Sequence, residues 1–418
     1  MYGEVALLNS NWMKYQQDHR TIRIKTALDE DLFVVSRFQG ADRVSGPFSY
    51  TLELLSPDAR LELKQLIGQP VQLFLETDRG DRFFHGYVKE FARTGASGDV
   101  VSYCAELAPW FDFLQHTGNC RIFQNKNVQE IIDEVFKAYL PLADYRYELN
   151  AGTYPKLDYC VQYNESDFHF VSRLLEDAGI YYAFEHGEDK HTMVLSDNST
   201  IAPAIGHVAT VRYRLDDDAR MDYDLEQWRA RRRVGADTHT LGSFDFKQPR
   251  SSLLSDSAAS IPRGMLPQLE RYSYDGAARF LDSRIGDMLA HVRSEEAAWP
   301  TKLFEGEGSC RHVYTGGYFQ LEGHFDHTES DATEREFFVV EVHHEATNNF
   351  NTEVTDGHAA GYRCALTALR RKIAFRPLRQ TPRQRMPGPQ TATVVGPPGE
   401  ELYADRYGRV KVQFHWDR

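Results

Sequence analysis

Three pairs of potential metal ligands lie close together in the second half of the sequence: His324 and His327, Cys310 and His312, and His343 and His344. Imidazole and thiolate groups are common zinc ligands, so folding could gather some of them around one ion. Adjacent residues of a strand, however, point to opposite faces of a sheet. The spacing therefore favours ordinary packed or surface histidines, and we expect no metal and no cofactor.

The patterns typical of catalytic sites are incomplete. The stretch His344–Asn348 begins like the zinc-protease motif H-E-x-x-H, but Asn348 occupies the place of the second histidine ligand. The sequence has no G-x-S-x-G and no G-x-x-x-x-G-K-[ST]. The run Asp216–Asp218 lacks the glycine and the distal glutamate of a calcium loop. We therefore predict that the chain is not an enzyme, and a cell-wall hydrolase is the least favoured alternative.

A basic stretch near the C-terminal end could bind an acidic partner. It contains seven basic residues and no acidic one: Arg370, Arg371, Lys372, Arg376, Arg379, Arg383 and Arg385. The whole chain has a net charge of −13, which repels a phosphate backbone, so we do not expect nucleic acid as a partner. A solvated linker interrupted by prolines is the simpler interpretation. Docking onto an acidic protein surface is the alternative, and salt should weaken it.

Composition and cysteine usage indicate where the chain folds. The five cysteines are scattered, without a C-x-x-C pair, which is typical of a reducing compartment and not of a disulfide framework. The N-terminal residues MYGEVALLNSNW have no basic n-region, and their apolar run ends at Asn9. We expect no signal peptide and no membrane span, hence assembly in the cytoplasm and no export by the general secretory route.

The first part of the chain follows the period of β-strands. Residues 1–20 are polar and irregular, and we interpret them as an N-terminal arm. From residue 21 to residue 116, apolar and polar residues alternate in several runs, as in Phe48, Tyr50, Leu52 and Leu54. Gly, Pro and Asp separate these runs. The pattern predicts an antiparallel β-barrel or sandwich over 21–116.

Residues 117–206 are predicted to form an α/β insert. Apolar residues recur at helical spacing in Asn127–Tyr139, where Asn127 and Glu130 form a capping-box pattern. A second helix is expected from Ser166 to Ala178, ended by Gly179. Two apolar runs that follow, at 180–184 and 193–195, flank a polar turn and predict a hairpin.

Strand patterns return over residues 207–380 and predict a second β domain. Within it, 237–267 is rich in Ser, Asp and Pro and is expected to form long loops, while 275–299 is expected to be one long helix. Strands are predicted near 302–311, 318–321, 337–343 and 362–369. Residues 381–389 contain three prolines and are interpreted as a linker.

The last segment, 390–418, contains an alternating strand pattern in Val410, Val412, Phe414 and Trp416. Two strands cannot bury a core alone. We therefore expect that this end is completed by something else, or that the chain is a fragment of a longer protein.

The chain resembles the VgrG family, the spike proteins of bacterial type VI secretion systems. The segments that carry the resemblance are CRIFQNKNVQEIIDEVF (120–136), YCVQYNESDFHFVSRLLEDAGIYYAF (159–184), VLSD (194–197), FRP (375–377) and QTATVVGPPGEELYADRYGRVKVQFHWDR (390–418). The resemblance implies an α+β, mainly β fold: two β-barrel domains of the tail-hub type with an α/β insert, followed by the start of an OB-fold at 390–418.

The same resemblance implies a mechanical function. Such proteins form a homotrimer whose six barrels make a pseudo-sixfold ring that caps the hexameric Hcp tube. A needle beyond the OB domain would carry a PAAR-repeat tip protein, and baseplate proteins and effectors would be further partners. The particle would be ejected through the secretion machine and would touch the target membrane only as part of it. The hub of a contractile prophage tail is the alternative within this class.

Overall fold

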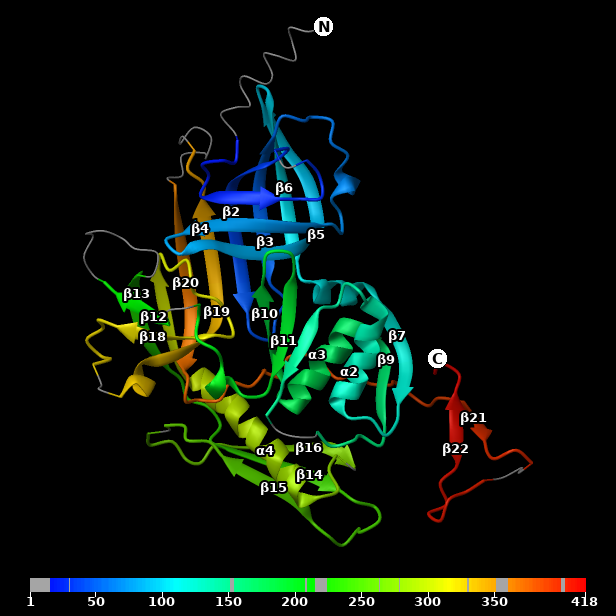
Figure 1. The fold of residues 1–418 in the computed structure, drawn as a ribbon. Helices are drawn as coiled ribbons and strands as arrows, with labels where there is room; N and C mark the ends of the chain where they lie inside the picture. Colours follow the sequence, from blue (N-terminus) through cyan, green and yellow to red (C-terminus); the bar gives the residue numbers. More distant parts are fainter. Residues whose placement is uncertain are drawn as a thin grey trace. The chain divides into compact units, whose positions relative to one another are not determined.

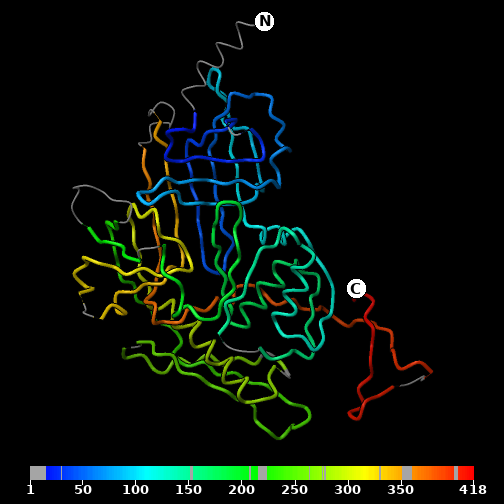
Figure 2. The backbone as a smooth tube through the Cα atoms, in the orientation of Figure 1, coloured from blue at the N-terminus to red at the C-terminus, as the bar shows by residue number. Residues whose placement is uncertain are grey.

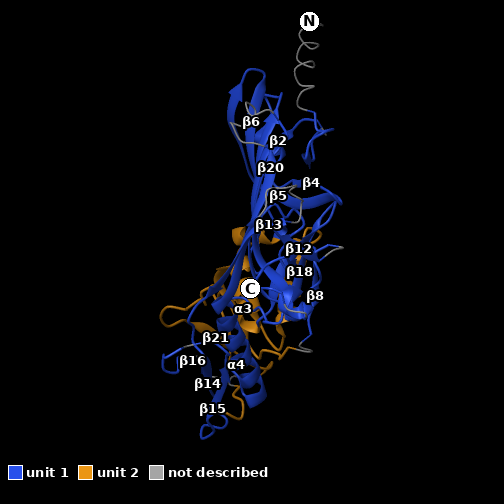
Figure 3. Cartoon of the chain, turned by 90° about the vertical axis from the view of Figure 1, so that its left-hand side faces the viewer, with its two compact units in different colours: residues 1–110, 144–150, 179–378 blue, residues 111–143, 151–178, 379–418 orange. Residues whose placement is uncertain are grey.

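The structure is a computed structural model that describes residues 16–29, 31–150, 154–206, 209–214, 224–262, 264–277, 279–328, 331–350, 360–399 and 403–418. It contains two compact units, coloured separately in Figure 3. The larger comprises residues 1–110, 144–150 and 179–378, and the smaller comprises 111–143, 151–178 and 379–418. Most of the predicted N-terminal arm and the run Asp216–Asp218 lie outside the described residues.

The first six strands of the larger unit form one group, hereafter the first barrel. They are β1 (Ile22–Lys25), β2 (Val34–Arg43), β3 (Ser49–Ser56), β4 (Pro70–Thr77), β5 (Gly80–Ser97) and β6 (Val100–Ala108). Their order is β1-β4-β5-β6-β3-β2, with antiparallel neighbours throughout. The alternation predicted from sequence is confirmed, because Tyr50, Leu52 and Leu54 of β3 are buried.

A second group of six strands closes on itself and is hereafter the second barrel. Its members are β12 (Thr210–Tyr213), β13 (Asp224–Arg232), β17 (Lys302–Gly308), β18 (Tyr318–Glu322), β19 (Glu336–Thr347) and β20 (Gly361–Arg370). The order is β19-β18-β12-β13-β17-β20, and β20 pairs again with β19. Aromatic rings fill its interior: Trp228 stacks on Phe304 and meets Phe337 edge to face. The predicted fold class, mainly β with barrels of this kind, is confirmed.

Strand β19 joins the two barrels. One of its edges pairs with β20 from Phe337 to Thr347. Its other edge pairs with β18 at 336–338 and then with β2 at 341–347. The change of partner coincides with a register shift against β20 at Val340, whose carbonyl accepts a hydrogen bond of 2.9 Å from the Val44 amide. A bulge bends a strand and increases its twist, which allows one strand to serve two barrels.

A small sheet with the order β10-β11-β8 contains the predicted hairpin. Its strands are β8 (Tyr145–Glu148), β10 (Tyr181–His186) and β11 (His191–Ser196). Strands β10 and β11 are antiparallel and joined by a turn in which the Gly187 amide donates to the Lys190 carbonyl at 2.8 Å. The hairpin, green in Figure 1, contacts β5 of the first barrel.

Residues 237–299 depart from the prediction. The expected long loops contain β14 (Thr238–Phe244) and β15 (Leu253–Ala258), and β16 (Glu270–Ala277) occupies the start of the expected helix. Helix α4 (Ser283–Ala298) begins only after Asp282, whose side chain caps it by accepting from the Arg284 amide. Figure 1 shows α4 lying across the sheet β15-β14-β16. The prediction was wrong here because strands with few apolar residues produce little alternation.

The smaller unit confirms the two predicted helices. Helix α2 (Val128–Phe136) has the complete capping box between Asn127 and Glu130, and α3 (Asp167–Ala178) ends before Gly179, whose φ is +72°. Strand β7 (Gly118–Phe123) pairs with β9 (Cys160–Ser166), and β21 (Ala392–Val395) pairs with β22 (Lys411–Phe414). Within the described residues, every helix is too short or too polar to cross a membrane.

Candidate functional site

The basic stretch 370–385 begins with side chains that bind carboxylates of the same chain. Arg370 and Lys372 both form ion pairs with Glu334. Arg371 Nη1 lies 2.9 Å from Glu336 Oε2. These contacts attach the residues that follow β20 to the start of β19 and the turn before it. This part of the stretch has a structural role.

Arg376 continues this pattern in a more buried setting. Its Nε lies 2.7 Å from Glu295 Oε2 on α4, and its Nη1 donates to the carbonyls of Gly179 (3.0 Å) and Asp197 (2.7 Å). The Trp299 indole donates to the Arg376 carbonyl at 2.8 Å. Because a guanidinium offers several donors in a fixed plane, Arg376 can tie three separate segments together.

The last part of the stretch belongs to the smaller unit. Arg383 Nη2 lies 2.7 Å from Asp177 Oδ2 at the end of α3. Thr381 donates to Glu176 from its amide (3.0 Å) and its hydroxyl (2.8 Å), and burial raises the pKa of that carboxyl. Arg385 is exposed and has no ion pair with any residue that the structure describes. Arg385 is therefore the cation of the stretch most open to a partner.

Asn348, which occupies the place of the second histidine in the zinc-protease motif, has a structural role. Asn348 is fully buried, and its amide Nδ2 donates to the carbonyls of Ile22 (2.8 Å) and Val35 (2.7 Å). Its Oδ1 accepts from the Ile22 amide at 3.2 Å. Strands β1 and β2 are the two ends of the first barrel, and no backbone ladder joins them among the described residues. The Asn348 side chain thus bridges the open seam of that barrel.

A buried polar network lies where the two barrels meet. His344 Nε2 is 2.7 Å from Asp42 Oδ2, and His344 Nδ1 is 2.6 Å from the Tyr362 hydroxyl. The Tyr50 hydroxyl donates to the other oxygen of Asp42. Burial lowers the pKa of His344 even though Asp42 opposes that change. Four strands supply these groups, so their proximity left no signal in sequence spacing.

Of the other candidate metal ligands, the structure brings together only the rings of His324 and His327 among the described residues, with centroids 5.1 Å apart. The Trp228 indole donates to His327 Nε2 at 3.0 Å, and His312 Nε2 lies 2.9 Å from Asp78 Oδ1. The Cys364 thiol donates to the Cys310 carbonyl at 3.5 Å. In the part of the chain that the structure describes, no three His, Cys, Asp or Glu side chains gather as a metal site would require.

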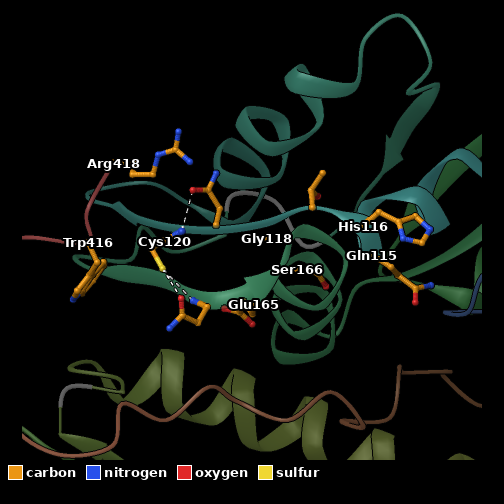
Figure 4. Close-up of a pocket in the computed structure, with 11 residues that line it drawn as sticks. Gln115, His116, Gly118, Cys120, Glu165, Ser166, Trp416 and Arg418 are labelled. Carbon is orange, nitrogen blue, oxygen red and sulfur yellow. Dashed lines mark hydrogen bonds between the residues drawn. The ribbon is translucent and has the colours of Figure 1, made fainter.

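The smaller unit contains a shallow cavity of about 550 Å³ between β7, β9 and the residues after β22. Figure 4 shows the Cys120 thiol on its wall, where it donates to Asn164 Oδ1 at 3.2 Å and accepts from the Asn164 amide at 3.3 Å. Glu165, also at this wall, is bound by Arg173 at 2.6 Å. The Cys120 thiol and the Glu165 carboxylate are thus both bonded to neighbours.

Comparisons with known proteins agree with this architecture. The family model described as phage tail baseplate hub (GPD) matches residues 41–350. The type VI secretion system spike proteins VgrG1a and VgrG1b of Pseudomonas aeruginosa are 35% identical over 401 residues and 34% identical over 410 residues. These alignments cover 96% and 97% of this chain but only 61% and 54% of the relatives. The chain therefore spans little more than half the length of the curated relatives it matches.

Solved structures with similar folds come from secretion systems and phage tails. A type VI secretion component of Escherichia coli, described as similar to the T4 bacteriophage tail proteins gp27 and gp5, has a TM-score of 0.66 at 19% identity and covers 94% of this chain and 88% of its own. A 43 kDa prophage tail protein of Shewanella oneidensis has a TM-score of 0.57 at 10% identity and covers 85% and 100%. At these identities the likeness concerns the fold alone.

Proposed function

Because this chain belongs to the phage tail baseplate hub family and is homologous to VgrG spike proteins, we propose that it is the hub of a type VI secretion spike and acts mechanically. The observation that carries this proposal is the fusion of two six-stranded barrels through the β2–β19 pair into one twelve-stranded sheet. A rigid pair of similar barrels is a suitable unit for building a ring.

Three copies of such a pair place six barrels around one axis. This arrangement matches a hexameric tube, so the homotrimer caps the Hcp tube with six similar surfaces facing six subunits. Symmetric closed rings are the usual form of homo-oligomers. The predicted domain limits, 21–116 and 207–380 for the barrels and 117–206 for the insert, define the parts of this ring.

The remaining partners follow from the same role. The OB domain that begins at 390 leads to a needle, which carries a PAAR-repeat tip protein, and baseplate proteins and effectors bind the assembled spike. The particle forms in the cytoplasm and leaves through the secretion machine. The chain supplies no chemistry, and contraction of the sheath supplies the energy for puncturing.

Light scattering on the natural full-length protein tests the proposal, with and without the tube protein. The expected result is three chains per particle at micromolar concentration, and a complex that contains tube hexamers. A full-length chain that stays monomeric under these conditions contradicts the proposal. Cryo-electron microscopy of the complex then checks that barrels of adjacent copies alternate around the ring.

The hub of a contractile prophage tail is the second candidate, supported by the shared fold of the Shewanella oneidensis tail protein. Neighbouring genes separate the two. Genes for sheath recycling and a membrane complex support a secretion system, whereas genes for a phage head support a prophage.

We also propose that the exposed end of the basic stretch docks onto an acidic protein surface of the particle. Arg385→Glu removes a cation without breaking an ion pair between described residues, and Arg250→Glu is a matched control at an exposed position of the larger unit. Arg385→Glu should weaken assembly more at 50 mM than at 300 mM salt, because salt screens the attraction. Equal assembly of both variants with the wild type contradicts the docking proposal.

A further inference from the structure

Histidines hold the tip of the β10–β11 hairpin against the first barrel. His186 ends β10, His191 begins β11, and the two are paired across the turn. Both rings contact Phe48, with ring centroids 4.9 Å and 5.2 Å apart. His85 of β5 completes the group, with its Nδ1 2.9 Å from Nδ1 of His191. The backbone of the hairpin and of β5 can be followed along the chain in Figure 2. Three imidazoles from three strands thus meet at the tip.

The hydrogen bonds decide which nitrogen of each ring carries a proton. The Trp110 amide donates to His191 Nε2 at 3.1 Å, so a neutral His191 has its proton on Nδ1 and donates it to His85 Nδ1. The His85 amide donates to His186 Nδ1 at 3.1 Å, so the proton of His186 lies on Nε2 and reaches the Tyr50 hydroxyl at 3.0 Å. A backbone N–H can only donate. A second proton on His186 or His191 would therefore break a hydrogen bond and face a donor.

The charged and titratable groups around the cluster do not compensate for added protons. These groups are Asp42, Tyr50, Arg82, Tyr87, Glu188, Asp189 and His344. Burial lowers the pKa of His85 to about 4, although Asp189 opposes it. Burial also lowers the pKa of His186 to about 4, where Asp42 opposes it and Arg82 adds to it. Burial and the two neighbouring histidines lower the pKa of His191.

The base of the hairpin is held by different forces. Tyr181 packs in an apolar cluster with Phe338 and Phe375, and the Ser45 amide donates to the Tyr182 carbonyl at 2.7 Å. None of these contacts involves a group that titrates between pH 4 and 7. Cavities of about 440 Å³ and 140 Å³ are lined by His186 and His85 respectively, which leaves room for the tip to move. A lower pH should therefore weaken the contacts of the tip and leave those of the base unchanged.

We propose that the hairpin tip is an acid-sensitive latch: when His85, His186 and His191 take up protons, the tip detaches from β5 while the base stays packed. This device is independent of the proposed role in assembly. Detached histidines have their ordinary pKa near 6.5, whereas the latched rings bind protons only at lower pH. The latch is therefore fully stable above pH 7 and loses stability as pH falls from about 6.5 toward 4. For a latched pKa of about 4, each histidine should raise the opening constant about 20-fold between pH 7 and pH 5.

Amide hydrogen exchange read by mass spectrometry tests the latch on the whole chain at pH 7.5 and pH 5.0, after correction for intrinsic rates. Protection in peptides covering 181–196 and 80–92 should fall at least about tenfold at pH 5.0, while β20 stays protected. The double variant His186→Gln/His191→Gln should lose most of this response and keep only the part due to His85, because glutamine keeps a donor and an acceptor but does not titrate. His343→Gln, at an exposed position of β19, should keep it. Equal tip protection at both pH values, or an unchanged response in the double variant, overturns the proposal.

A second measurement needs no variant. Exchange of the histidine C2 hydrogen in the wild type reports the pKa of each ring separately. The three latch histidines should titrate well below the ordinary histidine value near 6.5. Ordinary values near 6.5 for all three contradict the latch even if the double variant does not fold.

Discussion

The two barrels contain six strands each but are closed in different ways. In the second barrel, ten residues of β19 pair with β20, so the backbone itself completes the circle. In the first barrel, β1 and β2 remain unpaired with each other, and the side chain of Asn348 bridges Ile22 and Val35. Since Asn348 directly follows β19, the strand that completes the second barrel also positions the residue that closes the first.

The difference teaches that one strand can determine the integrity of both barrels. A ladder of backbone bonds tolerates most side-chain changes, because the bonding groups are present at every residue except proline. A seam made by one amide depends on that side chain. We expect the first barrel to be sensitive at single polar residues and the second at positions where backbones approach closely.

A substitution in the buried polar network where the two barrels meet should give the largest loss of stability. Asp42→Ala leaves the buried His344 and Tyr50 without their common acceptor, and we expect it to lower the free energy of unfolding by about 3–5 kcal/mol. Chemical denaturation followed by circular dichroism measures this. A loss below about 1 kcal/mol would mean that the network does not hold the barrels together.

A substitution where two backbones approach closely in the second barrel should give the second-largest loss of stability. A Cβ on Gly308 would lie 2.3 Å from the Asp224 carbonyl oxygen and 2.7 Å from Leu225 Cα. Gly308→Ala must separate β13 from β17, so we expect a loss of about 2–3 kcal/mol in unfolding free energy. Gly361→Ala in β20 is the matched control, because no atom lies within 4 Å of its added Cβ. Equal stability of the two variants would contradict the role of Gly308.

The seam of the first barrel can be opened selectively. Asn348→Ala leaves the buried Ile22 backbone groups without partners, which should destabilise the chain by about 2 kcal/mol. Hydrogen exchange in β1 should rise, while β20 stays protected. Asn349→Ala removes an amide whose bonds to the Thr21 amide and the His19 carbonyl are exposed to water, and it should change stability by less than about 1 kcal/mol. Loosening of β20 to the same extent as β1 would remove the distinction between the two closures.

The smallest effects concern the basic stretch. Arg376→Ala breaks the partly buried pair with Glu295 and two bonds to carbonyls, so we expect a loss of about 1–2 kcal/mol in thermal or chemical unfolding. Lys372→Ala, whose side chain is half exposed, should cost less than about 1 kcal/mol. The reverse order of the two variants would show that Arg376 is not the anchor of this segment.

Helices and strands were predicted correctly where their local sequence pattern is strong. Helix α2 was predicted from its apolar stripe and its Asn127–Glu130 box, and both are confirmed. Strands β14 and β15 were interpreted as loops, because β15 has the sequence LLSDSA with few apolar residues to alternate. Helix α4 was predicted to begin at 275, but β16, which pairs with β14, runs through residue 277, and Asp282 sets the true start of the helix. Pairing with distant strands overrides local preference in such segments.

The sequence by itself determined the mainly β character, the two helices of the smaller unit, the hairpin and the family, because each depends on neighbours in the chain or on motifs that can be read directly. Only the tertiary structure decided that β19 serves two barrels, that Asn348 bridges a seam and that His85 meets His186 and His191. These contacts join residues far apart in the chain: His85 and His186 are separated by 101 positions, and Ile22 and Asn348 by 326. The entropy lost in closing such loops is offset by the packing of the whole core. No local sequence pattern therefore indicates which residues will come into contact.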